Sequence, residues 1–172
     1  MTTTTSGTAL IRAAHPSEFS RVGELTVAAY VHGGHLRRED FYVQHLVRVA
    51  ERADSSSVLV AEVHGQILGT ATVTDFDGPF AEVSRPGELE FRMLAVAPEA
   101  QGRGVARALV RHIVQSAASR PDIRAVTLCS LKSMTAAHAL YESEGFVRNP
   151  DRDFVLDIPA KRETFPFFIR EV

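Results

Sequence analysis

Hydrophobic positions recur along this chain with two periods, one typical of helices and one typical of strands. Apolar residues follow helical spacing in residues 15–31, 38–53 and 133–145, and in a long segment that ends near Ser119. Short apolar runs rich in valine, threonine and phenylalanine favour strands, and a turn at residues 64–66 divides one of them into a hairpin. These strand runs are residues 9–14, 56–75, 88–97, 123–131, 153–158 and 163–170.

The order of these elements predicts the fold class. A strand at 88–97 is followed by a glycine turn, a helix, a strand at 123–131 and another helix. This order is typical of a right-handed crossover that joins two parallel strands. The run 123–131 is apolar enough for burial on both faces. Since the remaining strands form hairpins, the pattern predicts a mixed α/β fold with antiparallel flanks.

Length and composition favour a single globular domain. The chain has 172 residues, 45% of them hydrophobic, so we expect one domain over 1–172, with residues 1–7 disordered. A net charge of −2 gives no general attraction to nucleic acid or to an anionic membrane. Cys129 is the single cysteine, and no signal peptide or run of 18 apolar residues occurs. We therefore expect a cytoplasmic protein.

The stretch from Gln101 to Arg107 raises a chemical question. Gly102 and Gly104 open a helix, although glycine costs about 1 kcal/mol against alanine inside one. The N–H groups of a helix N-terminus bind anions such as phosphate, and glycine allows close approach. Val105 after Gly104 excludes a P-loop, and Arg107 occupies the third glycine position of a Rossmann fingerprint. The alternative is a tight turn between strand and helix.

Two short motifs resemble one family. Gln101, Gly104 and Ala106 follow a strand that ends in "LAVAP", as in the acetyl-coenzyme A (acetyl-CoA) pyrophosphate loop of the GCN5-related N-acetyltransferase (GNAT) family. "LYESEGF", from Leu140 to Phe146, is similar to the family's Leu-Tyr-x-x-x-Gly-Phe motif. The resemblance covers nearly the whole chain. It implies a mostly antiparallel seven-stranded sheet with about four helices, acetyl-CoA as cosubstrate and no metal.

The resemblance also implies roles for particular residues. Tyr141 would protonate the leaving thiolate, because a tyrosine keeps its proton at neutral pH. Unpaired N–H groups on the splayed strand at 88–97 would bind the acetyl carbonyl or the pantetheine arm. Many members carry an asparagine where this chain has Met134, and Ser133 beside it is the replacement. The implied cofactor contacts are Leu94, Ala95, Val96, Gln101, Gly102, Arg103, Gly104, Val105, Ala106, Arg107 and Ser133.

Glu90 is the candidate general base, because several family members carry a glutamate on this strand. Strand alternation places Glu90, Arg92, Leu94 and Val96 on one face. The alternative role of Glu90 is a structural salt bridge. Four nearby acids could replace it or attract a cationic acceptor, namely Asp75, Asp77, Glu82 and Glu88.

Cys129 could be a covalent nucleophile, but it lies in an apolar strand and is favoured as a core residue. His32, His35 and Asp40 are weak evidence for a metal. With Tyr30 and Tyr42, the two histidines are better interpreted as acceptor contacts near the break at 32–35. The last strand either completes the sheet or meets a second subunit, so a homodimer is one expectation.

The sequence therefore predicts an N-acetyltransferase that moves an acetyl group directly from acetyl-CoA to a primary amine. The acceptor is a small molecule or a peptide, and no nucleic acid or membrane partner is expected. The alternative is a non-catalytic module of the same fold that binds acyl-CoA or regulates another protein.

Overall fold

A seven-stranded sheet organises the molecule. The computed structural model describes residues 8–172, so the disorder predicted for residues 1–7 lies outside the described residues. The strand order in the sheet is β1-β2-β3-β4-β5-β9-β6, and only β4 and β5 pair in parallel. The mixed, mostly antiparallel fold class is therefore confirmed. The sheet strands are β1 (Leu10–Ala13), β2 (Ser57–Val63), β3 (Gln66–Asp75), β4 (Glu88–Val96), β5 (Ala125–Cys129), β6 (Val147–Arg148) and β9 (Phe167–Glu171).

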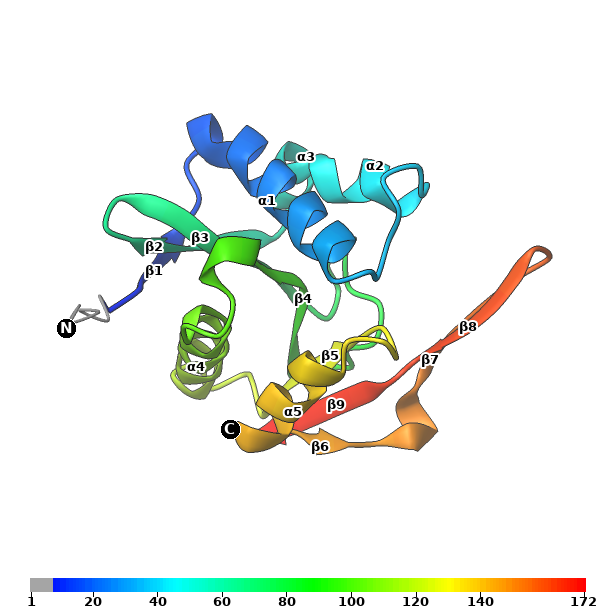
Figure 1. Ribbon diagram of the computed structural model, residues 1–172. Coiled ribbons are helices and arrows are strands. Elements are labelled where there is room, and N and C mark those ends of the chain that lie inside the picture. Colours follow the sequence, from blue (N-terminus) through cyan, green and yellow to red (C-terminus); the bar gives the residue numbers. More distant parts are fainter. Residues whose placement is uncertain (1–7) are drawn as a thin grey trace.

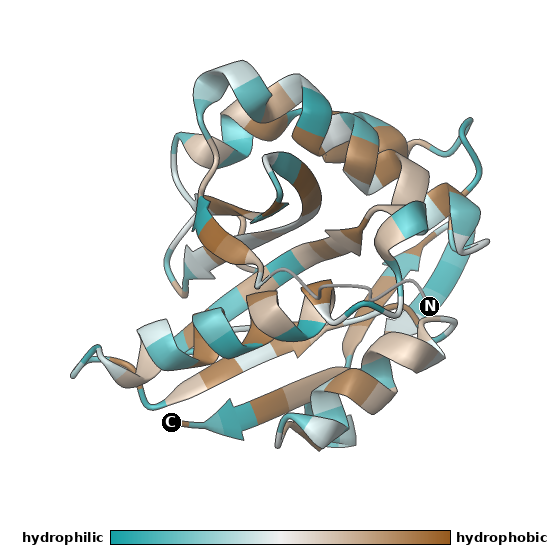
Figure 2. Cartoon of the chain, turned by 60° about the vertical axis from the view of Figure 1, so that its left-hand side comes forward, coloured by the Kyte–Doolittle hydropathy of each residue, from teal (hydrophilic) through white to brown (hydrophobic). Residues whose placement is uncertain are grey.

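Helices cover both faces of this sheet. Figure 1 shows α1 (Phe19–His32), α2 (Tyr42–Val47) and α3 (Val49–Ala53) on one side of the sheet, with α4 (Val105–Ala118) and α5 (Thr135–Ser143) on the other. Figure 2 shows that the central strands carry long hydrophobic stretches, whereas the helices alternate between hydrophilic and hydrophobic positions. This alternation buries one face of each helix against the sheet.

The helix predicted at 38–53 is broken into two. The backbone of Arg48 (φ −81°, ψ 58°) leaves the helical region and separates α2 from α3. Arg52 is 2% exposed and donates hydrogen bonds to the carbonyl oxygens of His45 (2.7 Å) and Leu46 (3.1 Å). The guanidinium thus satisfies carbonyls that the end of α2 leaves free. The described residues therefore contain five α-helices.

The strand predicted at 163–170 is also divided, at Pro166. Proline has no N–H for a sheet ladder, so the strand cannot continue through it. β8 (Lys161–Phe165) pairs with β7 (Phe154–Ile158) in a separate hairpin, and β9 enters the main sheet between β5 and β6. The hairpin projects from the body of the molecule (Figure 1).

α4 lies close against the sheet at its N-terminal end. Val105, Leu109 and Ile113 are at most 5% exposed, and burying each such side chain stabilises the fold by about 1.5–3 kcal/mol. A Cβ on Gly69 of β3 would lie 2.7 Å from the Val105 side chain. Gly69 therefore permits this close approach, which fixes the start of α4 beside the end of β4.

β4 and β5 separate after only three residue pairs. Glu88–Glu90 pair with Ala125–Thr127, and the rest of β4 continues without a partner in β5. A bulge between Arg92 and Ala95 changes the register with β3, and Met93 has a left-handed φ of 54°. Bulges increase strand twist, which accounts for the divergence. The splay that the family resemblance implies is thus present in this chain.

Candidate active site

A cavity of about 680 Å³ opens where β4 and β5 diverge. Its inner wall includes Phe91, Leu94 and Tyr141, and its opposite walls come from the α1–α2 segment, the 76–87 loop and the β7–β8 hairpin. Of the residues expected to contact the acceptor, Tyr30, His35 and Tyr42 line the cavity, whereas His32 lies outside the set of lining residues.

The bulge changes which side chains of β4 face the cavity. Strict alternation predicts that Arg92 and Leu94 share a face that excludes Met93. Instead, Arg92, Met93 and Leu94 all line the cavity. The prediction of alternation is wrong here, because the left-handed Met93 reorients the strand.

Tyr141 lies on the inner wall. Its ring packs against Phe91 and Phe168, with centroids 5.8 and 5.7 Å apart, and the residue is 4% exposed. Burial raises the pKa of Tyr141 above its ordinary value, so the hydroxyl keeps its proton at neutral pH. Among the described residues no hydrogen-bond partner is found for this hydroxyl.

An ion pair lies in the cavity beside the splay. The Arg92 guanidinium donates to Glu82 at 2.6 Å and to the Phe80 carbonyl oxygen at 2.8 Å. Burial raises the pKa of Glu82 despite its contact with Arg92, and the nearby Glu90 carboxylate adds to the rise. A carboxylate of raised pKa is a better proton acceptor than an ordinary one.

Glu90 has a different environment from the one expected for a base. It is fully buried and lies outside the set of cavity-lining residues. Its carboxylate accepts N–H groups of Glu82, Val83 and Ser84 at 3.0–3.2 Å, and the Ser84 hydroxyl at 2.9 Å. These contacts hold the 76–87 loop against β4. The base role of Glu90 stays a prediction, and the geometry favours Glu82 for it.

Cys129 also lines the cavity, with its Sγ 3.9 Å from a carboxylate oxygen of Glu82. Burial, together with the charges of Glu82 and Glu90, raises the pKa of the Cys129 thiol to about 12. A thiol of that pKa is protonated at neutral pH and is a poor nucleophile.

The glycine turn combines left-handed backbone with open space. Gly102 and Gly104 have φ of 74° and 82°, and Gly104 is the N-cap of α4 without a side-chain cap. No atom of residues 8–172 beyond their chain neighbours lies within 4 Å of a Cβ placed on either glycine. The protein's own packing therefore does not require these glycines. The backbone conformation does, and N–H groups at the start of a helix suit an anion such as phosphate.

Of the other predicted cofactor contacts, some are exposed, whereas others pack against or hydrogen-bond to neighbouring residues. Gln101 and Arg103 are exposed beside the turn, Ala106 is half-buried, and Val105 packs against the sheet. Arg107 is engaged with Ser143 (3.0 Å) and Glu144 on α5 and its C-cap. Ser133 lies 2.7 Å from His35 Nδ1, so it joins the 130–134 loop to the α1–α2 segment. Met134 lines the cavity.

The backbone of β4 has free donors at its open edge. The Ala97 N–H donates to the Leu68 carbonyl of β3 at 2.8 Å. Because N–H groups alternate along a strand, the Val96 N–H points to the opposite edge, where β5 has diverged. Ala95 is paired with Thr70 and buried, and Leu94 lines the cavity.

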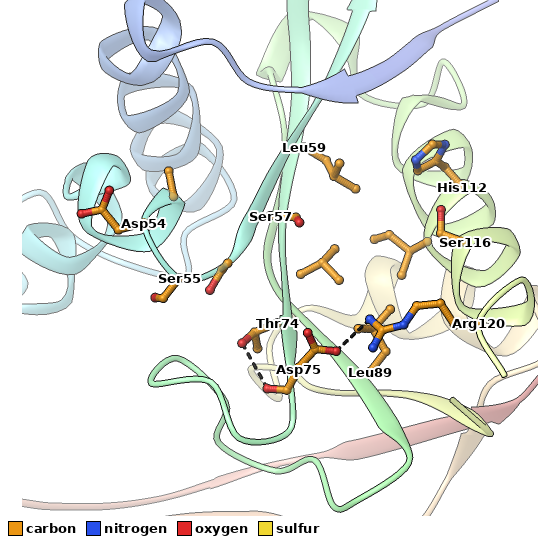
Figure 3. A pocket seen from close by; sticks show the side chains of 14 residues that line it. Asp54, Ser55, Ser57, Leu59, Thr74, Asp75, Leu89, His112, Ser116 and Arg120 are labelled. Atoms are coloured by element: carbon orange, nitrogen blue, oxygen red, sulfur yellow. Dashed lines mark hydrogen bonds and ion pairs between the residues drawn. The ribbon is translucent and has the colours of Figure 1, made fainter. Parts of the chain in front are cut away.

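A second cavity of about 490 Å³ lies between α4 and the β2–β3 end of the sheet. Figure 3 shows His112 and Ser116 of α4 facing Ser57 and Leu59 of β2 across it. Arg120 in this cavity is held by Asp75 (2.8 Å) and Asp122 (2.6 Å). Its charge is thus already neutralised by two carboxylates.

Sequence reasoning missed one wall of the first cavity. Phe154, Leu156 and Phe165 of the β7–β8 hairpin line it. The alternation of Phe154, Leu156 and Ile158 was the available signal, because it marks an apolar face on a strand that is otherwise exposed. The ion pair between Arg92 and Glu82 has no such signal, since the two residues come together only in the folded loop.

Comparison with known proteins defines the class. A sequence model of the acetyltransferase (GNAT) domain matches residues 54–148, more than half of the chain. The chain therefore belongs to the GNAT acetyltransferase family. Its fold is that of solved GNAT structures, as expected from the two motifs. A search among curated protein sequences gave no match.

Several solved structures share this fold over nearly their whole length. A GCN5-related N-acetyltransferase from Rhodopseudomonas palustris is 16% identical, with a TM-score of 0.69 and 96% of each chain covered. A GNAT acetyltransferase from Staphylococcus aureus Mu50 is 15% identical, with a TM-score of 0.70 and coverage of 95% and 98%. A ribosomal-protein-alanine N-acetyltransferase from Brucella melitensis is 24% identical, with a TM-score of 0.68 and coverage of 95% and 99%.

Membrane-spanning helices and metal-binding clusters are both absent from residues 8–172. No helix in this range is long and apolar enough to cross a membrane. Within the same range, no group of three or more His, Cys, Asp or Glu side chains is arranged to hold a metal ion.

Proposed function

We propose that this chain is an acetyl-CoA-dependent N-acetyltransferase that transfers the acetyl group directly to a primary amine. The observation that carries the proposal is the continuity of β4. Its open edge and Leu94 border the aromatic cavity, and its end leads into the open glycine turn at Gly102 and Gly104. β4 thus connects the turn proposed to bind the pyrophosphate with a cavity that contains the protonated Tyr141.

Different residues of this site would bind different parts of acetyl-CoA. The turn from Gln101 to Ala106 would hold the pyrophosphate through the first N–H groups of α4, with Arg103 adding charge. The N–H groups of Leu94 and Val96 would orient the acetyl carbonyl. Arg107 and Ser133 keep their predicted cofactor roles only if they leave their partners Glu144 and His35.

When bound, acetyl-CoA supplies the acetyl group as a thioester, whose carbon–sulfur bond breaks as the amine nitrogen bonds to the acetyl carbon. The Tyr141 hydroxyl holds its proton and donates it to the departing sulfur. Glu82 accepts the proton that the amine loses, directly or through one water, and Arg92 orients its carboxylate.

The cytoplasmic location and the homodimer stay predictions.

The test is a thiol-release assay with acetyl-CoA and a panel of primary amines, followed by mass spectrometry of the amine product. The proposal expects thiol release that depends on the amine, with an acetylated amine as the product. Acetyl-CoA binding without amine-dependent release would instead favour the non-catalytic acyl-CoA-binding module. Absence of binding would overturn both.

A further inference from the structure

Aromatic residues are concentrated in the first cavity. The chain contains three tyrosines and ten phenylalanines. All three tyrosines line the cavity, and five phenylalanines do so as well: Phe41, Phe80, Phe91, Phe154 and Phe165. These rings come from α1, the start of α2, the 76–87 loop, β4, α5 and the β7–β8 hairpin, so the cavity gathers aromatic surface that is distant in sequence.

Most of the acidic charge in this cavity is paired within the protein. Four of its lining residues are acidic, and three of them form ion pairs: Glu51 with Arg48 (3.9 Å), Glu82 with Arg92 (2.6 Å) and Glu163 with Lys161 (2.6 Å). The fourth, Asp40, accepts the N–H of Arg37 at 2.7 Å. A polycationic acceptor would need unpaired carboxylates here.

The acidic loop beside the cavity does not supply them. Glu88 is bound by Arg152 at 2.8 Å, Asp75 by Arg120 at 2.8 Å, and Glu90 of β4 by N–H groups of the 76–87 loop. The acids between 75 and 90 therefore give little support for a cationic acceptor, and Asp77, the remaining one, does not line the cavity.

Phe41 marks the entrance. It is 78% exposed, yet it lines the cavity and stacks edge-on against His45 at 5.2 Å. A concave site lined by apolar and aromatic side chains is typical of ligand pockets, and Phe41 extends this lining into solvent. On the opposite rim, Leu156 and Ile158 of the hairpin add apolar surface.

Resting on the proposed function, we propose that the acceptor is an amine carried by an aromatic or similarly bulky apolar body. The rings of the cavity enclose that body. The α1–α2 segment and the β7–β8 hairpin form the two walls that select it, and the amine faces the splay between β4 and β5. Polyamines and unhindered peptide N-termini are poorer acceptors, because they have no apolar body for the rings to enclose.

The test compares 2-phenylethylamine with spermidine and with a short peptide that begins with alanine. Acetyl-CoA binding is measured first, and its failure would remove the proposed function rather than the acceptor class. Binding of each amine is then measured by calorimetry with coenzyme A present, and turnover by thiol release. Burial of the ring predicts that 2-phenylethylamine binds at least about tenfold more tightly than the other two and has the highest kcat/KM. Equal or tighter binding of spermidine or the peptide overturns the acceptor class, as does failure of all three to bind.

Two matched pairs of variants test whether the acceptor binds between these two walls of the cavity. Phe41→Ala and Leu156→Ala remove cavity surface, whereas Phe76→Ala and Val155→Ala remove exposed apolar residues outside the set that lines the cavity. The first pair is expected to raise KM for 2-phenylethylamine by about five- to tenfold, with KM for acetyl-CoA unchanged. The second pair is expected to match wild type. Equal effects in both pairs would overturn the assignment of these walls.

Discussion

The loops at the two ends of β4 differ in what satisfies their polar groups. The 76–87 loop, before β4, donates three N–H groups and one hydroxyl to Glu90 and is held by the protein itself. The 101–104 turn, after β4, has left-handed glycines facing open space and a helix start without a side-chain cap. A loop with internal partners supports structure, whereas a turn with free donors is available for a ligand.

The largest expected effect comes from charging the open turn. Gly104→Asp should weaken acetyl-CoA binding by about 100-fold or more, since charged hydrogen bonds of about 1.5–3 kcal/mol each are lost and repulsion is added. Gly65→Asp is the matched control, because Gly65 also has a left-handed φ (76°) and open surroundings but lies in the β2–β3 turn. The measurement is the affinity of both variants for acetyl-CoA by calorimetry. Similar losses in both would mean that backbone strain, rather than the site, is being measured.

The second effect concerns the proton held in the cavity. Tyr141→Phe should lower kcat by about 100-fold and leave acetyl-CoA affinity near wild type, because only the hydroxyl is removed. Steady-state kinetics and calorimetry measure the two quantities, and a melting curve checks that the packing of the ring is retained. Unchanged kcat would remove the acid role from Tyr141.

The third effect distinguishes the carboxylate of Glu82, in the 76–87 loop, from that of Glu90, on β4. A base must be ionised, so the rate should rise with pH through the pKa of Glu82, which lies above its ordinary value. Glu82→Gln should lower kcat by about 100-fold and abolish this rise. Glu90→Gln should instead destabilise the fold by about 2–3 kcal/mol, because buried N–H groups lose a charged acceptor. If Glu90→Gln abolishes the pH rise and Glu82→Gln keeps it, the roles are reversed.

The smallest effect concerns two arginines near the open turn. Arg103→Ala should weaken acetyl-CoA binding by about tenfold at low salt and by less at high salt, as expected for an exposed phosphate contact. Arg107→Ala should change affinity little and lower the melting temperature, because Arg107 is bound to Glu144. Both variants are measured by calorimetry at low and high salt and by thermal melting. A salt-dependent loss of acetyl-CoA affinity in Arg107→Ala, with an unchanged melting temperature, would mean that Arg107 contacts the phosphates.

Local chemistry explains which features the sequence could predict. The turn at Gly102 and Gly104 and the helix after it are predictable, because glycine before an amphipathic segment acts locally. The hairpin at 57–75 follows from its turn residues for the same reason. The division at Pro166 was foreseeable from the missing N–H, although the predicted strand runs through it.

The arrangement of the cavity depends on long-range contacts that no local pattern specifies. The left-handed Met93 and its bulge place four successive residues of β4, Phe91 to Leu94, in the cavity, against simple alternation. The ion pair of Arg92 with Glu82 and the loop-anchoring role of Glu90 arise only when the 76–87 loop folds back over β4. The sequence therefore predicts where carboxylates are, but not whether another residue of the fold already pairs with them.

The most direct test of the central claim is a calorimetric titration of the unmodified chain with acetyl-CoA, and in parallel with pantetheine fragments such as S-acetylpantetheine that lack the pyrophosphate. One molecule should bind per chain, and binding should be lost with the fragments, because the donors of the open turn would have no anion to hold. Absence of heat with acetyl-CoA, or equal affinity for fragments without the pyrophosphate, would contradict the assignment of the turn and the acetyltransferase activity built on it.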